Sequence, residues 1–272
     1  MTNISFQKII YPLPSKQEER LIDLHVHSEY SLDGFLTTDQ LLRRAKRLGI
    51  GLAICDHNEI QGSREASHQK EIMIVPGIEV TVKSGTHLLF YFKNHSELEN
   101  FFKEVVLPHK KNNPFVIDLC LPDLLEEAKQ FECLIGSPHP FDLQKGGIQK
   151  ALESGLLLES ETEVIDLIEA VNGMASRKQN EKAINWARKM NKPTIGGSDG
   201  HLENQIGTVV TKVKGSAAEE VFENLKNSPS IMGKEATRLL KGYIEIKKEL
   251  KLVLRKDGLK ILTDQIQRGL RK

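Results

Sequence analysis

The chain contains 272 residues, of which 39% are hydrophobic and 28% are charged, as expected for one large domain or for one domain with an appendage. Lys and Arg total 38 and Asp and Glu total 37, so the net charge of +1 excludes a global electrostatic attraction to nucleic acid or to a membrane. The sequence has no run of about 18 apolar residues, which excludes a bilayer-spanning helix.

Apolar, β-branched runs alternate with helical patterns, which predicts parallel βαβ units. In chain order, strands are predicted at residues 21–27, 52–57, 72–82, 86–92, 134–139, 164–172, 193–199 and 207–213. Helices are predicted at residues 39–48, 63–69, 96–106, 122–131, 176–190 and 217–226. Thr38 is the predicted N-cap of the first helix and Gly49 its end, and Ser176 is the predicted cap of the helix at 176–190. The turn at residues 83–85 predicts a hairpin or a bent connection between the third and fourth strands.

About eight strands with intervening helices predict a (β/α) barrel of seven or eight strands. In such barrels the functional groups gather at the C-terminal ends of the strands. Periodicity alone fits an open doubly wound sheet as well. Candidate ligands from the first strand and from the strand near residue 199 favour closure, because an open sheet would hold these strands apart.

Side chains of the types that bind metals lie at the ends of most of these predicted strands. They are His25, His27, Asp33, His57, Glu79, His87, His139, Asp199 and His201. One histidine behind a strand is most often a core residue, but several strands ending in this way, mixed with carboxylates, indicate divalent metals. We therefore expect a metalloenzyme rather than a binding module.

His25 and His27 are two residues apart, so a regular strand directs both side chains to the same face. The strand is apolar, and a buried pair without a ligand would leave polar atoms unsatisfied, so we expect the two imidazoles to share one ion. Asp199 and His201 have the same spacing in a glycine-rich strand end.

Each of the remaining candidates, taken alone, is a weaker indication of a metal ligand. Asp33 precedes a glycine, and such an aspartate most often caps its own turn. In the Asp56-His57 pair we predict that the histidine is the ligand and that the aspartate orients neighbouring groups. Glu79 has apolar neighbours on both sides, and a buried glutamate is rare unless it is paired or coordinating.

In this order, the segments resemble the PHP (polymerase and histidinol phosphatase) family. The matching segments are HVHSEYSLDG, CDHN, GIE, THLLF, SPHP and SDGH, and residues 164–190 are similar to phosphoesterase-type members. Cys55 replaces the threonine usual before the Asp-His pair, and Gly200 replaces an alanine-like residue. Neither change is expected to affect coordination.

The resemblance implies a distorted (β/α)7 TIM-like barrel, the PHP fold, which we place at residues 1–230. Apolar residues at roughly helical spacing predict a basic helical extension at 231–272. The resemblance also implies two or three divalent ions. Carried over residue by residue, one ion would bind His25, His27, Glu79 and Asp199, a second Glu79, His87 and His139, and a third Asp33, His57 and His201. His68, His95 and His109 would remain as surface residues.

Imidazole and carboxylate ligands without thiolates suit Zn²⁺, Mn²⁺ or Fe²⁺. Clustered metals bring the pKa of a bridging water toward neutrality, so we predict a bridging hydroxide as nucleophile. The predicted reaction is hydrolysis of a phosphate ester of a small metabolite or nucleotide. The predicted catalytic residues are Asp33, His57, Asp199 and His201. Arg177 and Lys145 are candidate phosphate contacts, although a solvated position in the first helical turn explains Arg177 equally well.

Two alternatives stay open. Residues 234–272 carry twelve basic and five acidic residues, a net of +7 that leaves −6 for the rest, and this supports a phosphodiesterase or exonuclease acting on nucleic acid as a less favoured function. The second alternative is a regulatory barrel without catalysis, which missing ligands would indicate.

The three cysteines, Cys55, Cys120 and Cys133, form no CxxC pair and are odd in number, which predicts a reducing compartment. Cys55 lies in an apolar run and is expected to pack in the core. The first 20 residues lack the apolar segment of a secretory signal. We therefore predict a cytoplasmic protein without a membrane partner.

Overall fold

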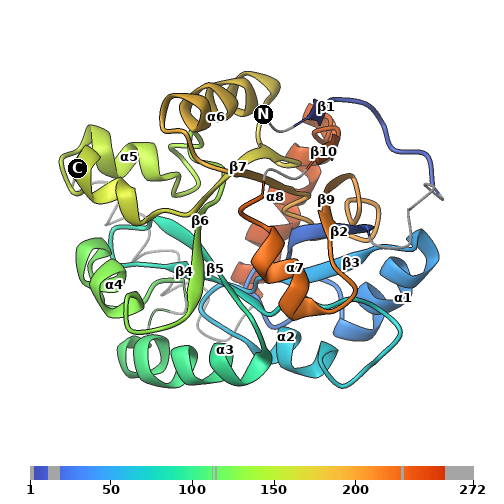
Figure 1. Ribbon diagram of the computed structural model, residues 1–272, viewed down its shortest axis with the longest axis horizontal. Helices are drawn as coiled ribbons and strands as arrows, with labels where there is room; N and C mark the ends of the chain where they lie inside the picture. The colour runs from blue at the N-terminus through green and yellow to red at the C-terminus, as the bar shows by residue number, and fades with distance from the viewer. Residues whose placement is uncertain (1–2, 12–18, 112, 114, 228–229, 255–272) are drawn as a thin grey trace.

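Ten strands form two five-stranded sheets in the computed structural model, which describes residues 3–11, 19–111, 113, 115–227 and 230–254 (Figure 1). The strands are β1 (Ile4–Ser5), β2 (Glu19–Val26), β3 (Gly51–Ile54), β4 (Gly77–Thr81), β5 (His87–Phe92), β6 (Cys133–Ser137), β7 (Leu167–Asn172), β8 (Thr194–Gly197), β9 (Val209–Lys214) and β10 (Ser230–Gly233). Their order is β1-β10-β9-β2-β3 in one sheet and β4-β5-β6-β7-β8 in the other. The pairs β2–β3, β6–β7 and β7–β8 are parallel, as βαβ units require, whereas β4 and β5 form the antiparallel hairpin expected around residues 83–85.

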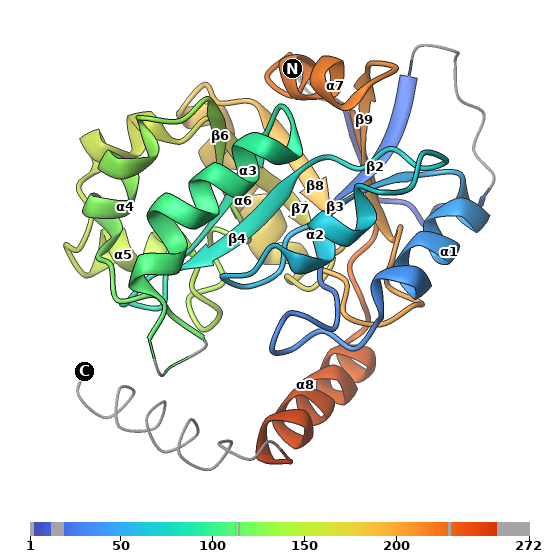
Figure 2. The same ribbon diagram turned by 90° about the horizontal axis from the view of Figure 1, so that it is seen from below.

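Helices cover the outside of both sheets (Figures 1 and 2). They are α1 (Thr38–Leu48), α2 (Gln61–Ala66), α3 (His95–Phe101), α4 (Leu121–Ala128), α5 (Ile148–Glu153), α6 (Arg177–Lys189), α7 (Ala218–Asn224) and α8 (Arg238–Val253), with the short helices η1 (Phe102–Val106), η2 (Leu107–His109) and η3 (Glu159–Val164).

The helix caps follow their sequence signals closely. Ser176 caps α6 as predicted, in a reciprocal capping box with Gln179. The prediction of Thr38 as the cap of α1 was wrong by one residue. Thr37 is the cap, because its side chain accepts a hydrogen bond from the backbone N–H of Gln40, and its own backbone N–H donates one to the Gln40 side chain. Gly49 ends α1 in the left-handed conformation, with φ of 68°.

The two sheets enclose a shared apolar interior. Ile22 and Leu24 of β2 pack there with Leu89, Leu167 and Ile195 from strands of the second sheet. The same cluster contains three residues at and after α7, which are Val221, Phe222 and Leu225. Helix α7 therefore closes one end of the interior, and α8 lies on the opposite face of the molecule (Figure 2).

The described strands form two separate hydrogen-bonded sheets, so the predicted closed barrel is not shown. Between the two sheets, isolated bridges join Leu52 of β3 to Ile74, which precedes β4, and His57, which follows β3, to Glu79 of β4. The end of β2 forms a bridge from Val26 to Gly200, in the segment that follows β8. The physical reason is that β9 runs antiparallel beside β2 and occupies the edge that β8 would need for a full ladder.

The predicted boundary at residues 230 and 231 falls within β10, which pairs antiparallel with β9. A helix, α8, follows as predicted, and residues 255–272 of the predicted extension lie outside the described residues. The division into two domains stays a prediction. Among the described helices, none combines the length and the apolar character needed to cross a bilayer.

Candidate metal centre

The nine candidate ligands converge at the end of the apolar interior that faces α8. Strand β2 carries His25 next to its last residue and leads to His27, and β3 leads to His57. The hairpin of β4 and β5 supplies Glu79 and His87. Two loops and the segment after β8 supply the rest, which are Asp33, His139, Asp199 and His201. We call these nine residues the histidine–carboxylate cluster. Four groups of three have ligand atoms that all lie within 4.8 Å of one another.

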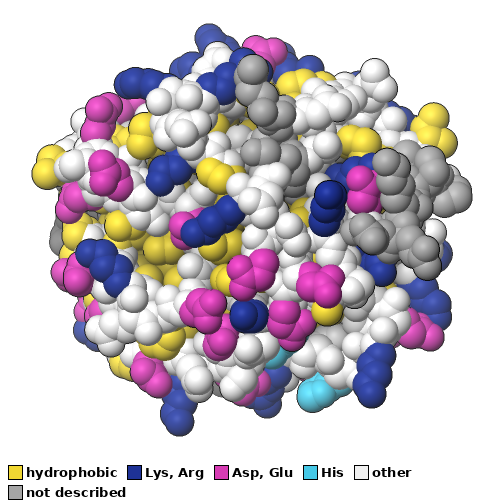
Figure 3. Space-filling view, viewed as in Figure 1, with side chains coloured by type: hydrophobic (Ala, Val, Ile, Leu, Met, Phe, Trp, Pro, Cys, Tyr) yellow, Lys and Arg dark blue, Asp and Glu magenta, His cyan; other side chains and the backbone are white. Residues whose placement is uncertain are grey.

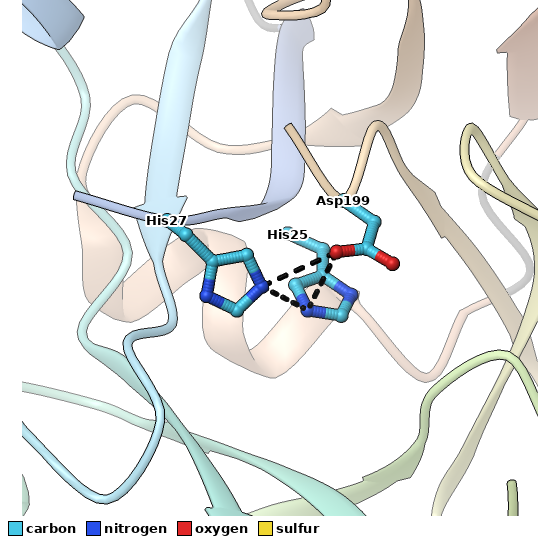
Figure 4. A group of neighbouring side chains, drawn as sticks. All are labelled: His25, His27 and Asp199. Carbon is cyan, nitrogen blue, oxygen red and sulfur yellow. Dashed lines mark hydrogen bonds and ion pairs between the residues drawn. The ribbon is translucent and has the colours of Figure 1, made fainter. Parts of the chain in front are cut away.

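The first group brings His25 and His27 to Asp199, although Asp199 is more than 170 residues further along the chain (Figure 4). The Nε2 atoms of the two imidazoles are 3.2 Å apart. Oδ1 of Asp199 lies 3.3 Å from Nε2 of His27 and 4.0 Å from Nε2 of His25. The i, i+2 spacing therefore directs both rings to one point.

Glu79 occupies the middle of the cluster and is 1% exposed. Its Oε1 atom lies 3.0 Å from Nδ1 of His87 and 3.4 Å from Nε2 of His139. Its Oε2 atom lies 3.4 Å from Nε2 of His25 and 3.2 Å from Nδ1 of His57. The two oxygens thus face different histidines, which is the arrangement of a carboxylate that bridges two cations.

Asp33 and His201 form the third part of the cluster. Oδ2 of Asp33 is 2.8 Å from Nε2 of His201 and 3.7 Å from Nε2 of His57. Ser31 donates a hydrogen bond of 2.6 Å to the other oxygen of Asp33. His57 lies between Asp33 and Glu79, so it can join either neighbouring group.

Two histidines are held in a tautomer that suits metal coordination. Nδ1 of His201 faces the backbone carbonyl of Asp199 at 2.7 Å, and a carbonyl only accepts, so this nitrogen carries the proton. In the neutral ring the Nε2 lone pair then faces the carboxylate of Asp33, which is repulsive without a cation between them. In His25, Nδ1 contacts Glu169 at 3.0 Å while Nε2 faces the cluster. Metal-ligating histidines are oriented in this way, so the donor set fits divalent ions.

Glu169 is a residue beside the cluster that the sequence analysis did not assign. It is 1% exposed, and besides His25 it accepts hydrogen bonds of 2.8 Å from the backbone of His139 and from the side chain of Asn172. Asn172 also donates to Asp199 at 3.3 Å. The signal was the charged residue within the apolar strand β7, since a buried lone glutamate is rare without a partner.

Two buried aspartates shape the backbone around the cluster. Asp56 accepts hydrogen bonds of 2.6 Å from the backbone and 2.5 Å from the hydroxyl of Ser28, the residue after His27, in agreement with an orienting role. Asp23 accepts from the backbone N–H groups of Ser198 and Gly207, both at 2.8 Å. It therefore ties β2 to the loop that carries Asp199.

The charges within the cluster shift the pKa values of its members. Burial alone would raise the pKa of Glu79, but the surrounding histidines, foremost His57, hold it well below its ordinary value. Burial alone would lower the pKa of His25 and of His57, but nearby carboxylates raise it well above the ordinary value for His25 and to about 9 for His57. Burial lowers the pKa of His87 to about 4. Against the effect of burial, nearby cationic groups also hold the pKa values of Asp33 and Asp199 well below the ordinary value, so the three carboxylates of the cluster are ionised at neutral pH.

A cavity of about 1000 Å³ opens onto the cluster. Among the residues lining it are Asp33, His57, Glu79, His87, His139, Asp199, Lys145 and Lys248. Lys145 thus lines the cavity, and its contact with a phosphate stays a prediction. Arg177 does not line this cavity, because Glu235 holds its guanidinium at 2.9 and 3.0 Å and its side chain lies over the Phe6 ring. This position disfavours the predicted contact and agrees with the alternative of a helix-surface residue.

The histidines outside the cluster take other places. His68 is exposed, whereas His95 and His109 are partly buried. Nδ1 of His109 lies 2.9 Å from the carbonyl of Val105, and Nε2 of His95 lies 3.4 Å from the hydroxyl of Ser63. The three cysteines are free thiols, and Cys55 is buried in the core as expected.

Comparison with known proteins places this geometry in a family. The sequence model of the PHP domain matches residues 23–179, and that of the PHP-associated region matches residues 177–228. An uncharacterised protein of Methanocaldococcus jannaschii is 28% identical over 195 residues, which are 70% of this chain and 69% of the relative.

Solved structures share the fold at low sequence identity. A two-domain protein from Bacteroides vulgatus that contains a predicted PHP-like metal-dependent phosphoesterase is 18% identical, with a TM-score of 0.59 over 91% of this chain and 74% of that one. The lesion-specific endonuclease EndoQ of Pyrococcus furiosus is 20% identical, with a TM-score of 0.60 over 78% of this chain and 57% of that one.

Proposed function

This chain belongs to the PHP domain family, and on that premise we propose that it is a metal-dependent hydrolase of phosphate esters. The observation that carries the proposal is the convergence of six histidines and three carboxylates in one cluster, six members of which line one cavity. Every ligand position that the family resemblance implies holds a histidine, an aspartate or a glutamate, which argues against a regulatory barrel without catalysis. Because one apolar interior lies between the two sheets, we also interpret them as a distorted (β/α)7 barrel.

We assign the cations as the family resemblance implies. One would be held by His25, His27, Glu79 and Asp199, a second by Glu79, His87 and His139, and a third by Asp33, His57 and His201. The contacts of Glu79 with histidines on both of its oxygens support its place between the first two. Mn²⁺, Zn²⁺ and Fe²⁺ all suit this mixture of imidazole and carboxylate.

Bound divalent ions would supply Lewis acidity and a nucleophile derived from water at neutral pH. The protein's own residues orient this centre. Glu169 and the carbonyl of Asp199 hold the Nδ1 sides of His25 and His201, so that both Nε2 atoms point inward and could bind a cation once unprotonated. Lys145 contributes a cation at the cavity, where it can bind a phosphoryl oxygen.

The cavity favours a small substrate. Its volume of about 1000 Å³ is at the upper end of the range for small-molecule sites. Helix α8 contributes Glu245, Lys248 and Glu249 to its lining, so a polymer would meet carboxylates as well as lysines there. The opposite face, seen in Figure 3, carries Lys and Arg interspersed with Asp and Glu, without a continuous basic stripe among its described residues.

Hydrolysis of phosphate esters by the metal-loaded protein tests the proposal. We expect p-nitrophenyl phosphate to be cleaved with Mn²⁺, and His25→Ala and Asp199→Ala to lower the rate by at least about a hundredfold through loss of a ligand. His68→Ala is the control, because this exposed histidine lies outside the cluster. Activity unchanged in both ligand variants would reject the site.

The alternative substrates are compared in the same assay. A screen of phosphorylated metabolites, nucleoside monophosphates and single-stranded oligonucleotides follows release of phosphate or of nucleotides. Preferred cleavage of oligonucleotides would favour a nuclease. The structurally similar EndoQ of Pyrococcus furiosus is named as an endonuclease. Metal analysis of the purified protein separates both enzymes from a protein that binds no metal.

A further inference from the structure

Helix α8 presents one face to the cluster. Residues of this face are three or four positions apart and so lie along one side of the helix. Lys241 donates to the carbonyl of Ala175 at 2.7 Å, and Glu245 pairs with Lys145 at 2.5 Å. Leu252, one turn after Lys248, is 7% exposed and lines the cavity. The helix therefore lies across the cavity with a defined orientation.

Lys248 is the residue of this face that reaches the predicted ligands. Its Nζ atom is 2.9 Å from Oδ2 of Asp33, the same oxygen that lies 2.8 Å from Nε2 of His201. The side chain is only 17% exposed and lines the cavity. Asp33 compensates the charge of this largely buried ammonium group, but a further anion is needed once the same carboxylate also binds a cation.

Charge balance identifies that anion. Asp33, Glu79 and Asp199 bring three negative charges to the cluster, and the buried Glu169 beside His25 brings a fourth. Three divalent ions would more than neutralise them. The ammonium group of Lys248 would then face a net positive centre at close range, which is unfavourable unless another anion joins it. The phosphoryl group of the proposed substrate is such an anion, and it would reach the cations and Lys248 together.

We propose that Lys248 binds a phosphoryl oxygen of the substrate, so that α8 completes the substrate site that the strands leave open. This inference rests on the proposed function. Lysine is suited to the task because its ammonium group carries three rotatable donors on a flexible stem and can turn from Asp33 to the incoming oxygen.

The test compares two lysines of the same helix. Lys248→Met removes the proposed contact, and Lys241→Met removes an equal charge that holds α8 to the carbonyl of Ala175, outside the cavity lining. For each Mn²⁺-loaded protein, calorimetry measures the Kd of inorganic phosphate, and elemental analysis measures the metal content. We expect Lys248→Met to raise the Kd by about tenfold or more, the value of a charge-assisted hydrogen bond. Its metal content should be unchanged, and Lys241→Met should resemble wild type in both.

The outcomes separate this inference from the proposed function. Phosphate binding that is equal in wild type and Lys248→Met, with hydrolysis of p-nitrophenyl phosphate in wild type, would overturn the role of Lys248 alone. Equal weakening in both lysine variants would also overturn it, because the effect would then come from the position of α8. A wild type that binds metal but neither binds phosphate nor cleaves the ester would overturn both. Partial recovery of phosphate binding in Lys248→Arg would support the role of the charge.

Discussion

Glu169 shows how a residue without direct contact to a metal position can control the centre. Its carboxylate accepts the hydrogen bond of His25 Nδ1 at 3.0 Å and raises the basicity of the ring. We predict that Glu169→Gln lowers metal affinity by about 10- to 100-fold, as measured by competition with a chelator. Glu104→Gln, an exposed change on η1, serves as the control. Equal affinity in the two variants would contradict the prediction.

At the residue scale, most of the cluster could be predicted because each ligand type has a recognisable setting. His25 and His27 show the spacing of a strand face, and Glu79 is a charge within an apolar run. Their meeting point depends on tertiary structure, so the sequence could not show that Glu79 faces histidines on both sides. Lys248 could not be predicted either, since a lysine in a helix is most often exposed.

The elements bring distant strands close enough for the cluster to form, and Gly197 in β8 is a point of close approach. A Cβ atom there would lie 2.4 Å from Cβ and 2.7 Å from the backbone nitrogen of His25. We predict that Gly197→Ala destabilises the protein by about 1–3 kcal/mol and lowers its metal content, because it displaces β2. Urea unfolding and elemental analysis measure the two effects.

Gly242 in α8 is the matched control for Gly197. A Cβ atom there would meet nothing within 4 Å, so Gly242→Ala should stabilise the protein by about 0.5–1 kcal/mol through helix propensity. If both alanine variants behaved alike, close packing between β8 and β2 would not be the cause.

Element boundaries were harder to predict than element types. The run at 72–82 was predicted as one strand, but β4 covers only Gly77–Thr81, and Ile74 forms an isolated bridge with Leu52. The helix predicted at 96–106 continues from α3 into a π-helix, η1. Strand β10 and helix α5 were not predicted, because segments of four and six residues give too little periodicity.

At the scale of the whole molecule, the cluster links metal binding to stability. Residues of both sheets meet in it, so ions bound there would hold the two sheets together. We predict that removing metal with a chelator lowers the Tm by about 10 °C, since ligand at a thousand times its Kd stabilises the folded state by about 4 kcal/mol. Scanning calorimetry with and without chelator measures this shift. The same Tm in both conditions would contradict a metal centre that joins the sheets.

The change in Tm on removal of metal should depend on pH with a defined sign. In the metal-free protein the pKa of His57 is raised from 6.5 to about 9, so the folded state binds more protons than the unfolded state between these values. The stability of the metal-free form therefore falls as the pH rises from 6.5 to 9. Metal binding requires unprotonated imidazoles, so metal affinity rises over the same window. The difference in Tm between loaded and metal-free protein should thus widen with pH, and a constant difference from pH 6.5 to 9 would show that His57 does not exchange its proton for a metal ion.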